Sequence, residues 1–451
     1  MQVRAIALSR LRGLDMRTAA PLITVGAGWT SRIVAALAQL AMIRVLTETL
    51  GIGGYGAFAI LTGLLGWFAL ADLGFGASVQ NFISQNRVDG KTSVDAIASV
   101  AAVLAGAMLC LTALWAGIAG WAGPFLLSAS QDITGQTATA GFFVFAVVAT
   151  GTGISAIALR ICFAEHRGYL AHLISAVSVL MSLALLLLVL PRLPAEDRFV
   201  WSLALFTGPT WILPMLFLAA YLIRHRARGH HFHLSFADVR RIWSRARIFL
   251  LYNAMAALVL NVDYIILSQT VSAPDVAEYA IFSRVYALAF FVFSSVLSAY
   301  WPVCAEMLHR GETQFVRKMI ARSILFGTAV ILGATSMLWL FAEPIAQVLA
   351  PRGTLVLSLG MIPLFAAYWI VRIWCDTFAM VVHSANRTTV LLMIGPVQAA
   401  LNIAFGWYGA QQGGLAGLLV GMTASFVLTV GWFLPVYMSR VVLRGAGVLR
   451  Q

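Results

Sequence analysis

The segment RHRARGHHFHLSFADVRRIWSRAR, residues 224–247, is the longest polar stretch of this 451-residue chain. It separates six apolar runs from six more, each long enough to cross about 30 Å of hydrocarbon. The runs before it span about residues 20–43, 54–80, 94–119, 138–159, 169–190 and 199–222. The runs after it span about residues 248–269, 277–303, 323–341, 354–381, 388–410 and 414–438. The pattern predicts an all-α integral membrane protein of about 12 transmembrane helices in two six-helix bundles.

Composition and charge agree with a membrane solvent and give an orientation. The chain is 61% hydrophobic and 10% charged, whereas soluble domains are about 25% charged. Of its 30 Lys and Arg residues, 23 lie in every second gap between the runs, including the tails. Because basic loops stay on the inner side of a membrane, both termini are predicted to be cytoplasmic and the chain to span the cytoplasmic (inner) membrane. The basic residues are dispersed over short loops, which argues against nucleic acid as a partner of this chain, whose net charge is +13.

These boundaries give a domain order that follows the charge pattern. The predicted parts are a basic cytoplasmic tail, a six-helix bundle, a basic amphipathic linker, a second six-helix bundle and a cytoplasmic tail: residues 1–19, 20–223, 224–247, 248–439 and 440–451. In the linker, apolar residues recur at helical spacing opposite arginines, and Ser235 with Asp238 resembles a capping box. A helix lying on the inner leaflet is therefore expected there. The linker histidines have no cysteine or carboxylate pair beside them, so a solvated linker is favoured over a metal site.

The two halves resemble one another. Tyr55-Gly56-Ala57-Phe58 recurs as Tyr279-Ala280-Ile281-Phe282, 224 residues later. Ala164-Glu165-His166-Arg167 recurs as Ser384-Ala385-Asn386-Arg387, 220 residues later. Six helices per half preserve orientation, so the repeat is predicted to be parallel. Many transporters consist of two such repeats around a midplane site.

Three arginines lie inside the apolar runs, namely Arg32, Arg284 and Arg372. An arginine in hydrocarbon costs at least about 2.5 kcal/mol on insertion scales, so each is expected to face a partner or a water-filled cavity. By helical spacing, the face of Arg32 carries small and polar residues: Gly28, Ala35, Ala36 and Gln39.

Three aspartates, Asp72, Asp263 and Asp376, also lie inside the runs. In one interpretation the charges are neutralised pairs that fix helix packing: Asp72 with Arg32, Asp263 with Arg284, and Arg372 with Asp376. In the other, the arginines face a cavity and hold an anionic headgroup, because a guanidinium stays charged and donates parallel hydrogen bonds to phosphate. The sequence leaves both interpretations open.

Two segments carry a family resemblance over most of the chain. RVLTETLGIGGYGAF at residues 44–58, followed by ADLGFGAS at residues 71–78, resembles the N-terminal signature of polysaccharide flippases. VDYIILSQTVSAPDVAEYAIFSRVY at residues 262–286 resembles the start of their second lobe. These flippases belong to the multidrug/oligosaccharidyl-lipid/polysaccharide exporter superfamily. The resemblance implies a two-lobed transporter that moves undecaprenyl-pyrophosphate-linked oligosaccharide from the inner to the outer leaflet by alternating access, for surface polysaccharide biosynthesis. It also implies a cationic lumen, for which Arg32, Arg284 and Arg372 are the candidates.

The implied partners are the lipid-linked oligosaccharide and membrane lipid, with polysaccharide assembly proteins as further candidates. The alternative function is a cation-coupled multidrug exporter of the same superfamily, which needs a titratable buried carboxylate such as Asp72 or Asp263. An enzyme is disfavoured because the external gaps are short and contain no catalytic motif such as HExxH. The sequence predicts no cofactor.

Overall fold

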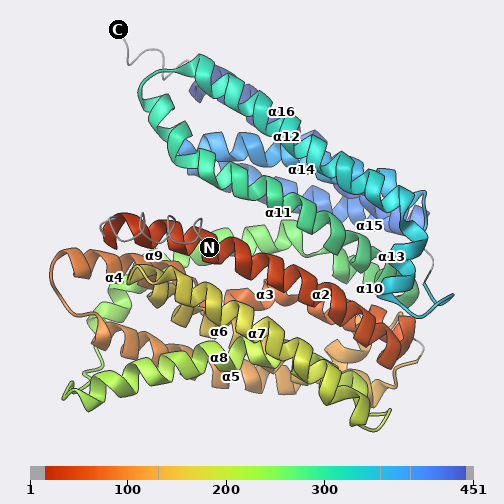
Figure 1. Ribbon diagram of the computed structural model, residues 1–451, viewed down its shortest axis with the longest axis horizontal. Helices are drawn as coiled ribbons and strands as arrows, with labels where there is room; N and C mark the ends of the chain where they lie inside the picture. The colour runs from red at the N-terminus through yellow and green to blue at the C-terminus, as the bar shows by residue number, and fades with distance from the viewer. Residues whose placement is uncertain (1–15, 131, 356, 386, 443–451) are drawn as a thin grey trace, which may run out of the picture. The chain divides into compact units, whose positions relative to one another are not determined.

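The computed structural model describes residues 16–442, apart from residues 131, 356 and 386. Every regular element in this part of the chain is helical, which confirms the predicted all-α class (Figure 1). Ten helical stretches among the described residues are long and apolar enough to cross a membrane. Most of the two predicted terminal tails lies outside the described residues.

Large apolar side chains face outward from these helices. Leu109 is 73% exposed, Trp121 is 68% exposed and Leu340 is 77% exposed. Such a surface is unfavourable in water but favourable in hydrocarbon, where helices also satisfy their own backbone hydrogen bonds. The helices therefore fit lipid as their solvent.

The helices form two compact units. The first unit comprises the described part of Met1–Thr49 together with Leu65–Pro124 and Thr134–Ala254. The second comprises Leu50–Leu64, Phe125–Ile133 and the described part of Met255–Gln451. Two short segments from the N-terminal half thus belong to the compact unit of the C-terminal helices.

The first unit contains most of the N-terminal helices. Its elements, in chain order, are the first part of α2 (Met16–Gly63), α3 (Leu65–Phe68), the 3-10 turn Ala69–Asp72, α4 (Phe75–Val88), α5 (Val94–Leu126), α6 (Gly135–Ala164), α7 (Gly168–Leu188), the 3-10 turn Leu190–Arg192, α8 (Arg198–Ala227) and most of α9 (Phe236–Leu260). α8 packs along α6 and α7.

The second unit contains the last part of α2 and the C-terminal helices. These are α10 (Asp263–Thr270), α11 (Ala273–His309), α12 (Thr313–Leu340), α13 (Ala342–Leu349), α14 (Met361–Ser384), α15 (Thr388–Phe426), the π-helical turn Val427–Gly431, α16 (Trp432–Tyr437) and the π-helical turn Met438–Val442. α11, α12 and α14 pack against one another, and α15 packs against α10 and α14.

Two long helices each contain one predicted span and the first part of the next. α2 kinks at Gly51, whose φ of 73° lies in the left-handed region that glycine adopts freely. α15 turns at Gly413 and Gly414, and Gly414 has a φ of 55°. Both breaks fall in gaps between predicted spans. These two breaks divide two of the ten apolar helical stretches, so the stretches agree with the prediction of about 12 spans.

The turn in α15 brings its two arms into backbone contact. A methyl group on Gly417 would come within 1.8 Å of the carbonyl oxygen of Gly409. Only residues without a side chain allow the arms to approach this closely. These glycines therefore fix the hairpin between the last two predicted spans.

The predicted run 54–80 is interrupted before it continues as α4. Leu73 and Gly74 have φ values of 52° and 75°. A methyl group on Gly74 would come within 2.2 Å of the carbonyl oxygen of Ala246, so the break allows close packing against α9. Asp72 accepts hydrogen bonds from the backbone N–H groups of Gly74 and Gly76, at 2.7 and 3.2 Å, and so caps α4.

α9 joins the predicted linker to the next predicted span in one helix. Ser235 accepts a hydrogen bond from the backbone N–H of Asp238 at 3.2 Å, which is half of the expected capping box. The backbone N–H of Ser235 donates to the hydroxyl of Ser99 at 2.9 Å instead of to Asp238. Ile242 is 2% exposed and belongs to the core of the first unit, whereas Phe236 is 80% exposed. One side of the amphipathic stretch is therefore packed on protein and another is uncovered.

The predicted repeat is confirmed by the turn after α6 and its counterpart after α14. The N–H of Arg167 donates to the carbonyl of Cys162, and the N–H of Arg387 donates to that of Val382, at 2.8 and 3.1 Å. Arg167 has φ and ψ of −108° and 34°, and Arg387 has −105° and 37°. Arg167 and Arg387, 220 residues apart, thus have the same backbone conformation.

Candidate functional site

Arg372 lies in α14 and forms the ion pair that its spacing predicted. Its guanidinium is 3.5 Å from the carboxylate of Asp376, one turn further along the helix. It also donates a hydrogen bond to the hydroxyl of Tyr368 at 3.2 Å. Four aromatic rings lie 5.3–6.0 Å from the guanidinium carbon: Phe290, Tyr368, Trp369 and Phe426. The cation is thus stabilised by a carboxylate, a hydroxyl and ring faces.

Nevertheless, the surroundings of Arg372 do not satisfy all of its donors. Its side chain is only 11% exposed. Its Nε is buried and has no hydrogen-bond partner among the described residues. A buried donor without a partner costs about 1–3 kcal/mol.

Asp263, the first residue of α10, does not pair with Arg284 as one interpretation expected. One carboxylate oxygen accepts a hydrogen bond from the hydroxyl of Tyr279 in α11. The other, Oδ1, is buried and has no hydrogen-bond partner among the described residues. Asp263 lies within electrostatic range of Arg372, but no ion pair with Arg284 occurs in this part of the chain. A neutral hydroxyl takes the place of the expected cation.

Arg284, in α11, is half-buried and lies beside two tyrosines. Tyr55 and Tyr264 are both within electrostatic range of its guanidinium. One terminal nitrogen of Arg284 and the hydroxyl of Tyr55 are buried, and neither has a hydrogen-bond partner among the described residues. All three residues belong to the second unit. A charged donor and a hydroxyl without partners can together bind an anionic oxygen.

Arg32 is exposed on α2 and lies near His172 in α7. Ser31 donates a hydrogen bond to the carbonyl of His172 at 2.9 Å, and the charge of Arg32 acts on the imidazole of His172. The ring of His172 lies so close to Gly28 that a methyl group there would come within 3.1 Å of its Nε2. The small residues expected on this face therefore allow helix packing against α7.

In the first unit, the charged neighbour of Asp72 is a residue that the sequence marked only as one of the basic residues orienting the chain in the membrane. Arg160, near the end of α6, is the cation within electrostatic range of Asp72. Arg160 also donates a hydrogen bond to Gln80 at 3.3 Å. Since both oxygens of Asp72 accept backbone N–H groups, its first role is structural.

Asp72 and Arg160 lie at a cavity, lined by both apolar and polar residues, that the sequence did not reveal. Its volume is about 440 Å³, and residues of α2, α6, α7 and α8 contribute to its walls. The polar residues lining it include Gln39, Thr152, Ser182, Thr207, Thr210 and Asn253. Serine and threonine residues on membrane helices only weakly indicate a cavity in the sequence, because most of them serve helix packing.

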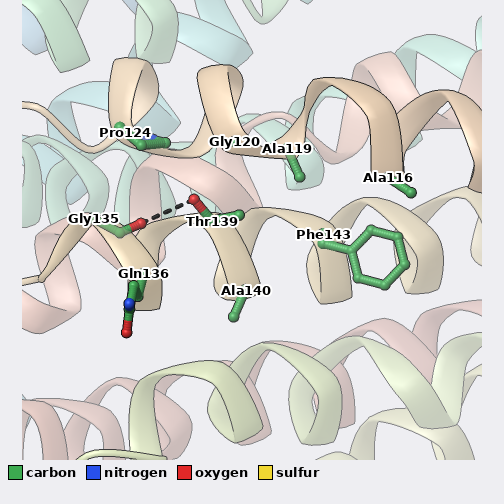
Figure 2. Close-up of a pocket in the computed structure, with 9 residues that line it drawn as sticks. All are labelled: Ala116, Ala119, Gly120, Pro124, Gly135, Gln136, Thr139, Ala140 and Phe143. Carbon is green, nitrogen blue, oxygen red and sulfur yellow. Dashed lines mark hydrogen bonds between the residues drawn. The ribbon is translucent and has the colours of Figure 1, made fainter.

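A second hollow lies between α5 and α6 but has a different chemical character. Its volume is about 590 Å³, and small or apolar residues such as Ala116, Ala119 and Phe143 dominate its walls (Figure 2). Its Thr139 hydroxyl donates to the carbonyl of Gly135 in its own helix. No charged residue lines it. The hollow therefore does not suit an anionic headgroup.

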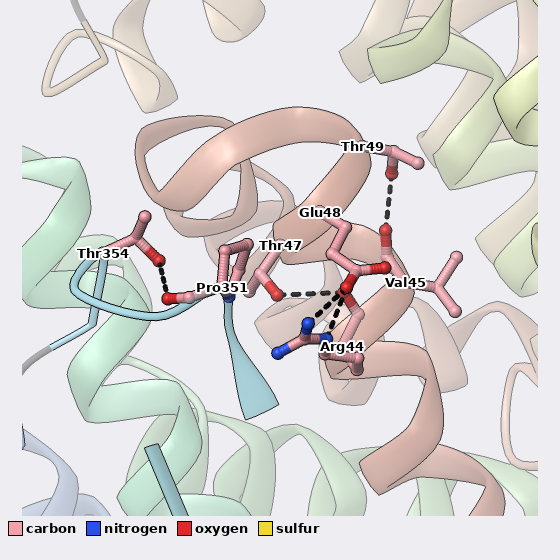
Figure 3. Close-up of polar contacts among 7 residues, drawn as sticks. All are labelled: Arg44, Val45, Thr47, Glu48, Thr49, Pro351 and Thr354. Atoms are coloured by element: carbon pink, nitrogen blue, oxygen red, sulfur yellow. Dashed lines mark hydrogen bonds and ion pairs between the residues drawn. The ribbon is translucent and has the colours of Figure 1, made fainter. Parts of the chain in front are cut away.

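Unlike Arg284, two more exposed arginines of the described residues form ion pairs with a glutamate one helical turn away. Arg44 and Glu48 form an ion pair one turn apart in α2, with Nε and Oε1 separated by 2.6 Å (Figure 3). Arg310 pairs with Glu306 in the same way in α11. Exposed pairs of this kind are worth only about 0.3–0.5 kcal/mol.

Comparison with known proteins identifies the family. A family model described as MatE matches residues 249–408. A Salmonella typhi protein, provisionally named an O-antigen transporter, is 31% identical over 92% of this chain and 95% of its own length. A Yersinia pseudotuberculosis protein, provisionally named an O-antigen export protein, is 30% identical over 93% of this chain and 96% of its own length.

Two solved structures share the fold at low identity. An inward-facing multidrug resistance MATE family transporter of the MOP superfamily has a TM-score of 0.69 and 14% identity, covering 91% of this chain and 96% of that one. The lipid II flippase MurJ, in an inward closed conformation, has a TM-score of 0.70 and 12% identity, covering 95% of this chain and 90% of that one. These likenesses concern the helical architecture, while the relatives with higher identity are named for transport rather than for an enzymatic reaction. Together the comparisons show that the chain belongs to the O-antigen transporter family, a family of multi-pass inner-membrane transport proteins.

Proposed function

We propose that this chain is a flippase that moves undecaprenyl-pyrophosphate-linked oligosaccharide from the inner to the outer leaflet of the cytoplasmic membrane by alternating access. The sugars and the pyrophosphate are too polar to cross hydrocarbon alone. The polyprenyl tail is apolar and can remain in lipid. The task thus needs a polar pathway and a cationic group, but no covalent chemistry.

The observation that supports this function best is the environment of Arg284. Its buried terminal nitrogen and the buried hydroxyl of Tyr55 have no hydrogen-bond partner among the described residues. Burial of such groups is unfavourable unless a ligand supplies the acceptor. A pyrophosphate offers several anionic oxygens, so its binding would remove this penalty. Arg284 is therefore the first proposed contact with the headgroup.

Arg372 and Arg32 are the other two proposed contacts. Arg372 keeps an unpartnered Nε although Asp376 and Tyr368 occupy its terminal nitrogens. Arg32 is exposed and is the candidate within the first unit. The proposal predicts that each arginine contributes to headgroup binding, with Arg284 contributing most.

Export in cells tests the proposal directly. In a strain that lacks the gene, variants Arg32→Gln, Arg284→Gln and Arg372→Gln should each reduce surface polysaccharide while remaining abundant in the membrane. Normal export by all three variants would refute the cationic site. Loss of the protein itself from the membrane would instead favour purely structural ion pairs.

A cation-coupled multidrug exporter is the second candidate, favoured by the MatE match and by the buried Oδ1 of Asp263. Such an exporter would couple drug efflux to a proton or sodium ion through a buried carboxylate. Reconstituted protein should then show transport of lipophilic cations that depends on the ion gradient and disappears in Asp263→Asn. Oligosaccharide flipping that ignores pH, sodium and voltage would argue against this function.

A further inference from the structure

Several side-chain oxygens in the wall of the first unit's cavity can accept hydrogen bonds from the hydroxyl groups of a ligand. Its polar walls come mainly from neutral side chains, including Thr152, Ser182 and Thr210. The hydroxyl of Thr152 donates to the carbonyl of Val148 at 3.2 Å, whereas Ser182 is only 1% exposed. The hydroxyl of Thr210 donates to the carbonyl of Thr207 at 2.6 Å. Because the hydroxyl protons of Thr152 and Thr210 are used by the backbone, their oxygens offer only lone pairs to a ligand.

Other groups at the same cavity can donate hydrogen bonds to a ligand. Gln39 and Asn253 line it and carry amide donors, and Arg160 carries guanidinium donors. Thr207 is 2% exposed and its Oγ1 is buried, so its hydroxyl is not among the groups that a ligand can reach. A ligand that both donates and accepts hydrogen bonds would satisfy these walls. Sugar hydroxyls do both.

The charges at the cavity disfavour a cation as its ligand. Asp72 is the only carboxylate that lines it. Both oxygens of Asp72 already accept backbone N–H groups, and Arg160 is within electrostatic range. No group of three or more possible metal ligands occurs in the described part of the chain. The local balance of charge therefore suits a neutral polar ligand.

The internal repeat places different residues at the corresponding sequence positions of the second unit. Ala149, Thr152 and Ala156 of α6 line the cavity. The residues 220 positions later are Trp369, Arg372 and Asp376 of α14. In α14, Arg372 lies 5.6 Å from the ring of Phe290 and 5.8 Å from that of Trp369. The α6 positions that line the cavity therefore carry smaller side chains than their counterparts in the C-terminal repeat.

We propose that this cavity is a sugar subsite, which binds a neutral sugar residue of the transported oligosaccharide through its hydroxyl groups. The inference deepens the proposed function and rests on it. The volume of about 440 Å³ lies within the range of roughly 300–1,000 Å³ of small-molecule sites. Phe206, which also lines the cavity, supplies an apolar surface for a sugar face. The cationic and sugar-binding roles are thereby assigned to different residues of the chain.

Binding measurements on the full chain in lipid nanodiscs test the subsite. The probe is the oligosaccharide released by mild acid from the producing strain's own lipid carrier, with neither phosphate nor lipid attached. Saturation-transfer NMR should detect its binding to the unaltered protein. Thr152→Val and Thr210→Val should each weaken it about threefold to tenfold, as expected for one lost hydrogen bond. Ala149→Trp, which introduces the side chain of the C-terminal repeat, should abolish it.

Thr139→Val is the matched control for Thr152→Val. Thr139 lies on the same helix and its hydroxyl likewise donates to a backbone carbonyl, but it lines the apolar hollow instead (Figure 2). Thr139→Val should leave oligosaccharide binding unchanged. Equal binding by the control and all three cavity variants would overturn the subsite. Absence of oligosaccharide binding to the unaltered protein, or binding of rhodamine 6G that Ala149→Trp abolishes, would overturn it as well.

A second probe separates this inference from the proposed function. Farnesyl pyrophosphate carries the headgroup without sugar, and its binding should be weakened by Arg284→Gln but not by Thr152→Val. If farnesyl pyrophosphate binds Arg284→Gln normally while Thr152→Val still weakens oligosaccharide binding, the arginine site fails and the sugar subsite stands. If only Arg284→Gln has an effect, the sugar subsite fails and the arginine site stands.

Discussion

Tyr279 donates a hydrogen bond to Asp263, from α11 to the first residue of α10. Both residues are buried, and the hydroxyl is the direct partner of the carboxylate. Arg284 lies five residues after Tyr279 on α11 but forms no ion pair with Asp263. The positive charge of Arg284 therefore remains available to an anion.

Replacement of Arg284 should reduce headgroup affinity without unfolding the protein. A charge-assisted hydrogen bond contributes about 1.5–3 kcal/mol, so Arg284→Gln should weaken farnesyl pyrophosphate binding about tenfold to hundredfold. The measurement is a binding titration in nanodiscs. Arg310→Gln, which removes an exposed arginine paired with Glu306 on the same helix, is the matched control. Equal affinity of the two variants would contradict the prediction.

Loss of the Tyr279 hydroxyl should destabilise the second unit. Tyr279→Phe leaves the buried Asp263 without its hydrogen bond, so the free energy of unfolding should fall by about 1–3 kcal/mol. Denaturant unfolding in detergent micelles measures the difference. The control is Tyr408→Phe, because Tyr408 is 66% exposed. A similar stability of both variants would show that the Tyr279 contact has no stabilising role.

Arg372 and Asp376 should be energetically coupled. A buried ion pair broken on one side costs about 3–5 kcal/mol, but Asp376 is 36% exposed, so about 1–3 kcal/mol is expected for Asp376→Asn. In Arg372→Gln/Asp376→Asn no charge remains unpaired, and the double variant should lose less stability than the sum of the single variants. The same unfolding measurement gives the coupling energy. Simple additivity would mean that the pair does not stabilise α14.

The hairpin within α15 should depend on Gly417 but not on Gly413. Alanine at Gly417 would place its methyl group within 1.8 Å of a backbone oxygen, so at least about 1–3 kcal/mol of overpacking is expected. Gly413 has open space around it and a φ of −140°, which other residues adopt easily. Gly417→Ala should therefore lower the unfolding midpoint, and Gly413→Ala should not. Comparable midpoints for both would show that the two arms can separate without cost.

Local spacing allowed part of the site to be predicted. Arg372 and Asp376 are four residues apart, and any α-helix places such residues side by side. Arg167 and Arg387, in the repeated motifs, also share their backbone conformation and hydrogen bond. In contrast, the partners of Asp263 and Asp72 depend on which helices pack together. Tyr279 and Arg160 could not be assigned from spacing along one helix.

The sequence alone determined that this chain is a helical membrane protein with two related halves. Apolar length, the alternation of basic residues and the repeated motifs are properties of the chain in one dimension, and they act through transfer to lipid and local helix geometry. Tertiary packing decided which buried charges are satisfied. Among the described residues it left Arg284 without an ion pair, and it left a cavity beside Thr152, the position that corresponds to Arg372 in the other half of the chain. Such features depend on distances between helices, because hydrogen bonds and ion pairs act over only a few ångströms.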